Sequence, residues 1–137
     1  MYKLFVDGSF ANNRCGSGWV LVDNLDRIVA KESVPLKSDN GMRQVTGELD
    51  AVMFGIYECL EREIKELEIH FDYLGIREWV TGAWKAKNVH TQNYRDLMRD
   101  VEKEINIKFV KVKAHSGNYF NDLADKLSKE ACDYQWI

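Results

Sequence analysis

Four acidic residues stand where folding could bring their carboxylates together. Asp7 and Asp72 each follow a short apolar run, whereas Glu48 and Asp122 each directly precede a leucine of an amphipathic segment. Converging carboxylates suit hard cations such as Mg²⁺, which prefers oxygen ligands. Two such cations, about 3.5–4 Å apart, can promote hydrolysis of a phosphodiester bond. The residue types therefore fit metal-assisted phosphoryl chemistry.

Each acid also has an ordinary structural interpretation. Asp7-Gly8 is a common turn dipeptide, and Glu48 near a helix start offsets the helix macrodipole. Asp122 could pair with Lys126 on a solvated helix face. For Glu48 and Asp122 taken singly this interpretation is favoured, because acidic residues are common in first helical turns. Asp72 is harder to explain in this way, because it directly follows an apolar strand pattern, and the four acids together favour the chemical interpretation.

A sheet is expected to position these acids. Apolar and alternating patterns predict strands at residues 2–6, 16–23, 27–36, 67–72 and 107–113. The first strand is apolar enough to be covered on both faces. A short turn at 24–26 joins the second strand to the third, so the chain should begin with three antiparallel strands.

Helical periodicity fills the remaining segments. It predicts helices at residues 46–63, 76–80, 94–104 and 120–131, the last capped by Ser116 or Asn118. The order βββαβ, helices, βα indicates an α/β fold with a five-stranded mixed sheet flanked by helices. A strand reached through a helix usually lies parallel to the first strand, and ligands bind at the carboxyl ends of such strands. Asp7 and Asp72 should then be neighbours.

Composition limits the class of protein. The 137 residues fit one domain over 1–137, and the 45% hydrophobic and 30% charged content is ordinary for a globular protein. No apolar run is long enough to span a membrane and no signal peptide is recognisable, so we expect a cytoplasmic protein. Three widely spaced cysteines predict reduced thiols. The net charge of −3 requires any nucleic-acid site to be local.

Several motifs resemble the type 1 ribonuclease H family. They are Asp7-Gly8-Ser9, Gly16-Ser17-Gly18-Trp19, Gly47-Glu48-Leu49-Asp50-Ala51, Asp72 at a strand end, and the block from His115-Ser116-Gly117-Asn118 to Asp122-Leu123-Ala124-Asp125. Their order and spacing, and the βββαβ…βα layout, are similar over nearly the whole chain. The closing block is the most specific part. The resemblance implies a ribonuclease H-like fold.

The resemblance also implies roles for particular residues. It places the metal ligands and catalytic acids at Asp7, Glu48, Asp72 and Asp122, and a catalytic loop histidine at His115. Asp122 is preferred to Asp125 because in the family an Asn stands four residues before the metal-binding Asp, as Asn118 does here. His115 would assist proton transfer or product release. Alternatively, His115 has a structural role, as a polar loop residue that shapes the turn into the last helix.

The activity implied is an endonuclease that hydrolyses the RNA strand of RNA–DNA hybrids. Two Mg²⁺ ions per site, with Mn²⁺ as a substitute, would give 5′-phosphate and 3′-hydroxyl products. The hybrid is the expected partner of a monomeric protein. Candidate substrate-binding residues are Asn12, Gln44, Trp84 and Lys85, although loop or packing roles also suit them. Lys108, Lys111 and Lys113 are expected on a solvated strand face, without a functional role.

Two other functions remain open. A catalytically silent module could keep this fold to bind hybrids or a protein, although all four acids and His115 are present. A DNA exonuclease or resolvase of the same fold is the other alternative. The common exonuclease version has a second acid two residues after the first, where this chain has Ser9. Metal titration and a comparison of nucleic-acid substrates would distinguish these functions.

Overall fold

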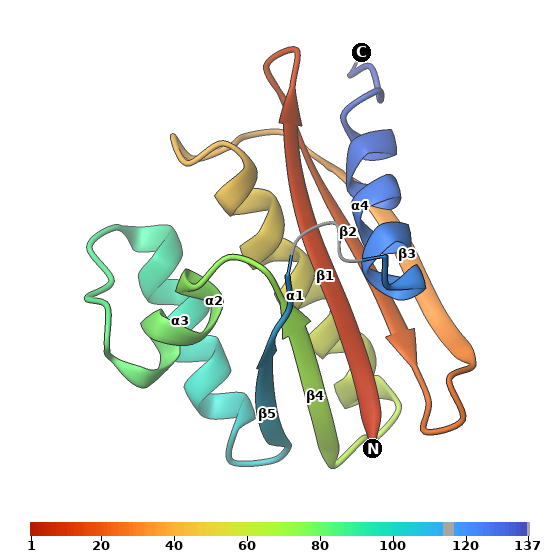
Figure 1. The fold of residues 1–137 in the computed structure, drawn as a ribbon. Helices are drawn as coiled ribbons and strands as arrows, with labels where there is room; N and C mark the ends of the chain where they lie inside the picture. Colours follow the sequence, from red (N-terminus) through yellow and green to blue (C-terminus); the bar gives the residue numbers. More distant parts are fainter. Residues whose placement is uncertain (114–116, 137) are drawn as a thin grey trace.

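A computed structural model describes residues 1–113 and 117–136, which fold around a five-stranded sheet (Figure 1). The strands are β1 (Tyr2–Ala11), β2 (Arg14–Val22), β3 (Ile28–Leu36), β4 (Glu66–Phe71) and β5 (Asn106–Lys111). Their order in the sheet is β3-β2-β1-β4-β5. The first three strands pair antiparallel, whereas β4 pairs parallel to β1 and β5 parallel to β4. The predicted mixed sheet is confirmed.

Helices cover the two faces of the sheet unequally. They are α1 (Gln44–Glu61), α2 (Gly75–Thr81), α3 (Val89–Val101) and α4 (Tyr119–Ala131). Buried residues of α1, α2 and α3 share one hydrophobic core, and α4 packs against a second core on the opposite face. Figure 1 shows α4 over β2 and β3 and next to β1, with α2 and α3 on the side of β5. The acids of α4 and of α1 therefore approach the sheet from opposite faces.

Consecutive buried residues in β1 and β2 result from these two cores. Leu4 and Leu21 belong to the core under α1, whereas Phe5, Val20 and Val22 belong to the core under α4. Because successive side chains of a strand point to opposite faces, a strand covered on both faces has no polar side. The apolar opening segment was predicted to be covered in this way, and the structure confirms it.

The first strand is longer than predicted. The predicted strand stopped at Val6, but β1 continues to Ala11 because it pairs with β2 as far as Ala11 opposite Arg14. Asp7 is therefore inside β1, opposite Gly18, rather than at its end. The parallel pairing of β1 with β4 nevertheless stops at Phe5. Asp7 thus still lies just past the point where the parallel strands separate.

Two helix starts show how local capping fixes boundaries. The third helix begins at Val89, five residues before the predicted start, because Asn88 and Thr91 form a reciprocal capping box. In α4, the Asn118 side chain accepts hydrogen bonds from the backbone N–H groups of Phe120 and Asn121. Asn118 is thus the N-cap of α4, while the other predicted cap, Ser116, lies outside the described residues.

No helix among the described residues has the length and apolar character needed to cross a bilayer.

Candidate active site

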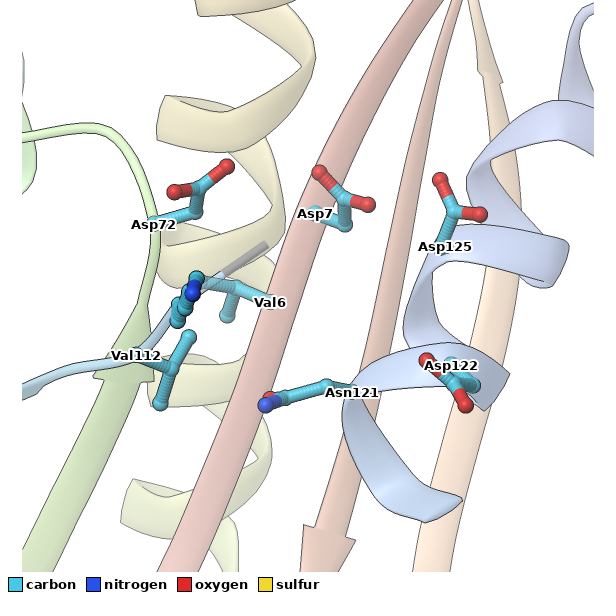
Figure 2. Close-up of a pocket in the computed structure, with 8 residues that line it drawn as sticks. Val6, Asp7, Asp72, Val112, Asn121, Asp122 and Asp125 are labelled. Atoms are coloured by element: carbon cyan, nitrogen blue, oxygen red, sulfur yellow. The ribbon is translucent and has the colours of Figure 1, made fainter. Parts of the chain in front are cut away.

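Asp7, in β1, and Asp72, directly after the neighbouring strand β4, share two clefts. One cleft is lined by both acids together with Asp122 and Asp125 of α4. The other is lined by both acids together with Glu48 of α1. Figure 2 shows the side chains of Asp72, Asp7 and Asp125 around the first cleft, contributed by the end of β4, by β1 and by α4 respectively. Acids from four segments of the chain therefore meet at one edge of the sheet.

Glycines allow α1 to approach close enough to place Glu48 beside this edge. A Cβ atom at Gly8 would collide with the backbone of Gln44 and Glu48, and one at Gly47 would collide with the backbone of Gly16. The buried Ser17 hydroxyl also donates a hydrogen bond of 2.6 Å to the Gly47 carbonyl. The first turn of α1 is therefore fixed directly against β1 and β2, next to Asp7.

The Glu48 carboxylate is buried and reaches the end of β4. Its Oε1 accepts hydrogen bonds of 3.2 Å from the backbone N–H groups of Asp72 and Tyr73. Loss of hydration raises the pKa of Glu48 to about 7, although these two hydrogen bonds and the charge of Lys111 act in the opposite direction. A buried carboxylate with a raised pKa at a cleft is a frequent property of functional sites.

Asp7 is held among other acids. A side-chain hydrogen bond joins it to Asp125, and its own Oδ1 accepts a 2.9 Å hydrogen bond from the Gly8 N–H. Burial, followed by the charge of Glu48 and the contact with Asp125, raises the pKa of Asp7 from 3.8 to about 8. Close carboxylates cannot all be ionised without repulsion. Additional positive charge near Asp7 would therefore favour its ionised form.

Asp125, rather than Asp122, is the acid of α4 that contacts Asp7. Asp125 is half-buried and Asp122 is exposed, about one turn nearer the helix start (Figure 2). Asp7 is opposite Gly18, and a Cβ at Gly18 would collide with the Ala124 carbonyl of α4. The close approach at Gly18 is what brings this face of α4, with Asp125, against Asp7.

The sequence contained a signal for Asp125 that the prediction did not use. Asn121 stands four residues before Asp125, with the same spacing that links Asn118 to Asp122. The family spacing was thus satisfied by both acids. Asp122 does line the first cleft, and its suggested partner Lys126 pairs instead with Glu130 at 3.9 Å.

The donor set fits a hard divalent cation. All the candidate ligands are carboxylate oxygens, the donors that Mg²⁺ prefers. Within residues 1–113 and 117–136, however, His, Cys, Asp and Glu side chains form no group of three near enough to hold one ion. Glu48 is bound to two backbone N–H groups, and Lys111 Nζ lies 3.4 Å from Asp72 Oδ1. These carboxylates therefore have partners that a cation would have to replace.

The predicted substrate-binding residues do not all lie at the clefts. Gln44 and Trp84 line the second cleft with Glu48 and Asp72. Trp84 is 38% exposed and makes an edge-to-face contact with Tyr73, at 5.8 Å between ring centroids. Asn12 is at the exposed turn between β1 and β2, and Lys85 is exposed on the segment after α2; neither lines these two clefts.

One predicted residue is outside the described structure, and two residues that line the second cleft had no predicted role. His115 belongs to residues 114–116, which the structure does not describe. Tyr73 was not predicted, and Lys111 was expected to have no functional role, yet both line the second cleft. Tyr73 directly follows Asp72 and Lys111 is the last residue of β5, so their positions at strand ends were the available signals.

The fold and the acids at its edge define an α/β protein of the ribonuclease H type, and comparisons with known proteins agree. Residues 1–133 match the family model for RNase H. A ribonuclease H of Erythrobacter litoralis is 31% identical, and the alignment covers 97% of this chain and 96% of the relative. The chain belongs to the ribonuclease H family.

Solved structures support the same fold. The RNase H1 of the halophilic archaeon Halobacterium salinarum NRC-1 superposes with a TM-score of 0.82 at 22% identity, covering 96% of this chain and 97% of that one. LC11-RNase H1 in complex with RNA/DNA hybrid superposes with a TM-score of 0.76 at 15% identity, covering 96% of this chain and 99% of that one. At these identities the likeness concerns the arrangement of the backbone.

Proposed function

We propose that this protein is a metal-dependent endonuclease that hydrolyses the RNA strand of RNA–DNA hybrids. The observation that carries the proposal is the meeting of Asp7, Glu48, Asp72 and Asp125 at the edge of the sheet where β1 and β4 separate. Membership of the ribonuclease H family supports it, as does the hybrid bound by the structural relative LC11-RNase H1.

Asp7, Glu48, Asp72 and Asp125 would hold the metal ions, with Asp122 as the alternative fourth acid. Two Mg²⁺ ions, or Mn²⁺ in their place, would when bound activate the attacking water and stabilise charge on the leaving oxygen. Because the pKa values of Asp7 and Glu48 are raised, bound cations would favour the ionised forms of these acids, and metal binding would release protons. The chain itself supplies the rigid framework, through the close contacts of Gly8, Gly18 and Gly47.

The second cleft suits the nucleic acid. Gln44, at the start of α1, can offer hydrogen bonds to a minor groove that displays 2′-hydroxyl groups. Trp84 presents a partly exposed ring on the same cleft, suited to stacking on a sugar, and Lys85 follows it in sequence. Asn12 is proposed to reach the hybrid from the turn between β1 and β2. Because the chain carries a net charge of −3, the cations must supply part of the attraction for phosphates.

Hydrolysis would leave 5′-phosphate and 3′-hydroxyl ends. His115 would help proton transfer or product release. We propose a single domain over 1–137 that acts as a monomer in the cytoplasm.

A comparison of three substrates tests the proposed activity. Labelled RNA–DNA hybrid, RNA duplex and DNA duplex are each incubated with the protein and Mg²⁺, with EDTA in parallel. We expect cleavage of the RNA strand of the hybrid alone, abolished by EDTA and by Asp72→Asn. Equal cleavage of all three duplexes would contradict the substrate assignment. Cleavage that survives Asp72→Asn would point to a contaminating nuclease, and no cleavage at all would favour a silent binding module.

A further inference from the structure

Lys111 has an unusual position for a lysine, because it continues an apolar row of β5. Ile107 and Phe109 face the core under α1, and period-two alternation puts Lys111 on the same face. Lys111 is paired in register with Phe71, directly before Asp72. The row that packs against the core therefore ends with an ammonium group at the edge of the sheet where the acids meet.

The Lys111 ammonium group is held at the cleft by two contacts, although its side chain is partly exposed. Its Nζ lies 3.4 Å from Asp72 Oδ1 and donates a hydrogen bond of 2.9 Å to the Val112 carbonyl. The side chain is 38% exposed and lines the same cleft as Glu48 and Asp72. Its charge also acts on Glu48, lowering the pKa that burial raises.

Two lysines offset the negative charge of the acids, one on each side of the site. Lys129 pairs with Asp125 at 2.9 Å, four residues along the exposed side of α4. Lys111 is the cation at the other end, where Asp72 and the buried Glu48 meet. A divalent cation held by Asp72 would compete with this ammonium group, because Lys111 Nζ already lies 3.4 Å from Asp72 Oδ1. At that range a unit positive charge repels a dication appreciably, even at a hydrated surface.

Building on the proposed metal-dependent function, we propose that Lys111 is a built-in counter-ion of Asp72 that a divalent cation must displace, and that it thereby weakens metal binding at this end of the site. Lys111 is a positioning residue in this role, because it acts through Asp72. The cost of displacing Lys111 raises the concentration of divalent cation that is needed to fill the site. It also keeps the carboxylates compensated, and the site folded, at low concentrations of metal.

Removal of the charge provides the test. Lys111→Met keeps most of the length of the side chain and removes the ammonium group, whereas Lys111→Arg keeps the charge. Lys108→Met is the matched control, because Lys108 is exposed on the same strand but on the opposite face. Asp72→Asn reports on the metal site itself. Mn²⁺ affinity is measured at low ionic strength from the electron paramagnetic resonance signal of the free ion.

We expect Lys111→Met to bind Mn²⁺ about fivefold to tenfold more tightly than the wild type, the effect of removing one unit charge near a dication. The Mn²⁺ affinity of Lys111→Arg should lie within about twofold of the wild type, because the variant keeps the charge. Lys108→Met should also lie within about twofold, because the charge of Lys108 is distant from the site and screened by solvent. A second readout is thermal unfolding. The rise in Tm on addition of Mn²⁺ should be larger for Lys111→Met than for the wild type, because the variant binds the ion more tightly. The Tm of its metal-free form should be lower than that of the wild type, because Asp72 loses its counter-ion.

The outcomes separate this proposal from the proposed function. If Asp72→Asn weakens Mn²⁺ binding but Lys111→Met leaves the affinity unchanged or lowers it, the role of Lys111 is refuted and the metal site stands. If Lys108→Met tightens binding as much as Lys111→Met, a general charge effect replaces the specific one. If the wild type binds no Mn²⁺, or Asp72→Asn has no effect, the proposed metal site is refuted and the role of Lys111 with it.

Discussion

Replacing Asp7 by Asn should make the metal-free protein more stable. In the folded chain the pKa of Asp7 is raised from 3.8 to about 8, first by burial, then by the charge of Glu48 and the contact with Asp125. Between these two pH values the folded state holds a proton that the unfolded state has lost. Stability must then fall as pH rises through this window, because folding takes up a proton.

The size of the effect follows from the same shift. At pH 7 the unfolded carboxyl is about three pH units above its pKa, and each unit corresponds to about 1.4 kcal/mol, so the upper limit is about 4 kcal/mol. We expect about 2 kcal/mol of stabilisation by Asp7→Asn, because solvent screens part of the repulsion in a half-buried group. The Asn side chain keeps an oxygen to accept from the Gly8 N–H and gains an N–H to donate to Asp125.

Urea unfolding of the wild type and of Asp7→Asn, from pH 4 to pH 8 in EDTA, measures this effect. The two proteins should be similar near pH 4 and diverge as pH rises, with the variant the more stable at pH 7. Asp133→Asn, at an exposed position near the end of the chain, is the control and should follow the wild type. A variant that is less stable than the wild type at pH 7, or curves that remain parallel across the range, would refute the reasoning about a crowded, protonated acid.

Three further substitutions test the parts that position the site. Gly8→Ala should destabilise the protein by about 1–3 kcal/mol and greatly reduce cleavage, because the added Cβ would push the start of α1 away. Urea unfolding and a cleavage assay measure these two effects. Wild-type activity would show that the close contact at Gly8 is not needed. Asn118→Ala should cost about 1 kcal/mol through loss of the α4 cap, and an unchanged urea midpoint would show that the cap is not needed. Tyr94→Phe removes a buried 2.7 Å hydrogen bond to the Ile76 carbonyl, so it should cost about 1–3 kcal/mol in urea unfolding, and reduced cleavage by the folded variant would be unexpected.

Local patterns were sufficient to predict the class of fold. The alternation at Leu67, Ile69 and Phe71 and the helical spacing in α1 are properties of adjacent residues, and the structure confirms both elements. The length of β1 was not predictable in the same way. It depends on pairing with β2 beyond Val6, where polar and glycine residues form a hairpin without an apolar pattern.

The site was predictable where it follows from topology and ambiguous where it depends on packing. Parallel neighbours place Asp7 and Asp72 together. Asp122 and Asp125 satisfy the same spacing to an Asn, and only the rotation of α4 against Gly18 turns Asp125 toward Asp7. That rotation is a non-local contact and has no signature in the order of residues.

Lys111 illustrates the same limit. In the sequence it looked like one of several lysines on a solvated strand face, because alternation alone does not show which face of β5 is covered. In the folded chain, Lys111 lies on the face of the sheet that α1, α2 and α3 cover. There it is next to Asp72 and lines the same cleft as Glu48. Its contacts are set by the tertiary structure.

The central claim is that Asp7, Glu48, Asp72 and Asp125 form a metal-dependent site that cuts RNA paired with DNA. The single-turnover rate of RNA-strand cleavage in a labelled hybrid, at saturating Mg²⁺, tests it most directly when Asp125→Asn and Asp122→Asn are compared with the wild type. We predict that Asp125→Asn loses at least about a hundredfold in rate, while Asp122→Asn stays close to the wild type. Rapid cleavage by Asp125→Asn, or its loss in Asp122→Asn alone, would contradict the account.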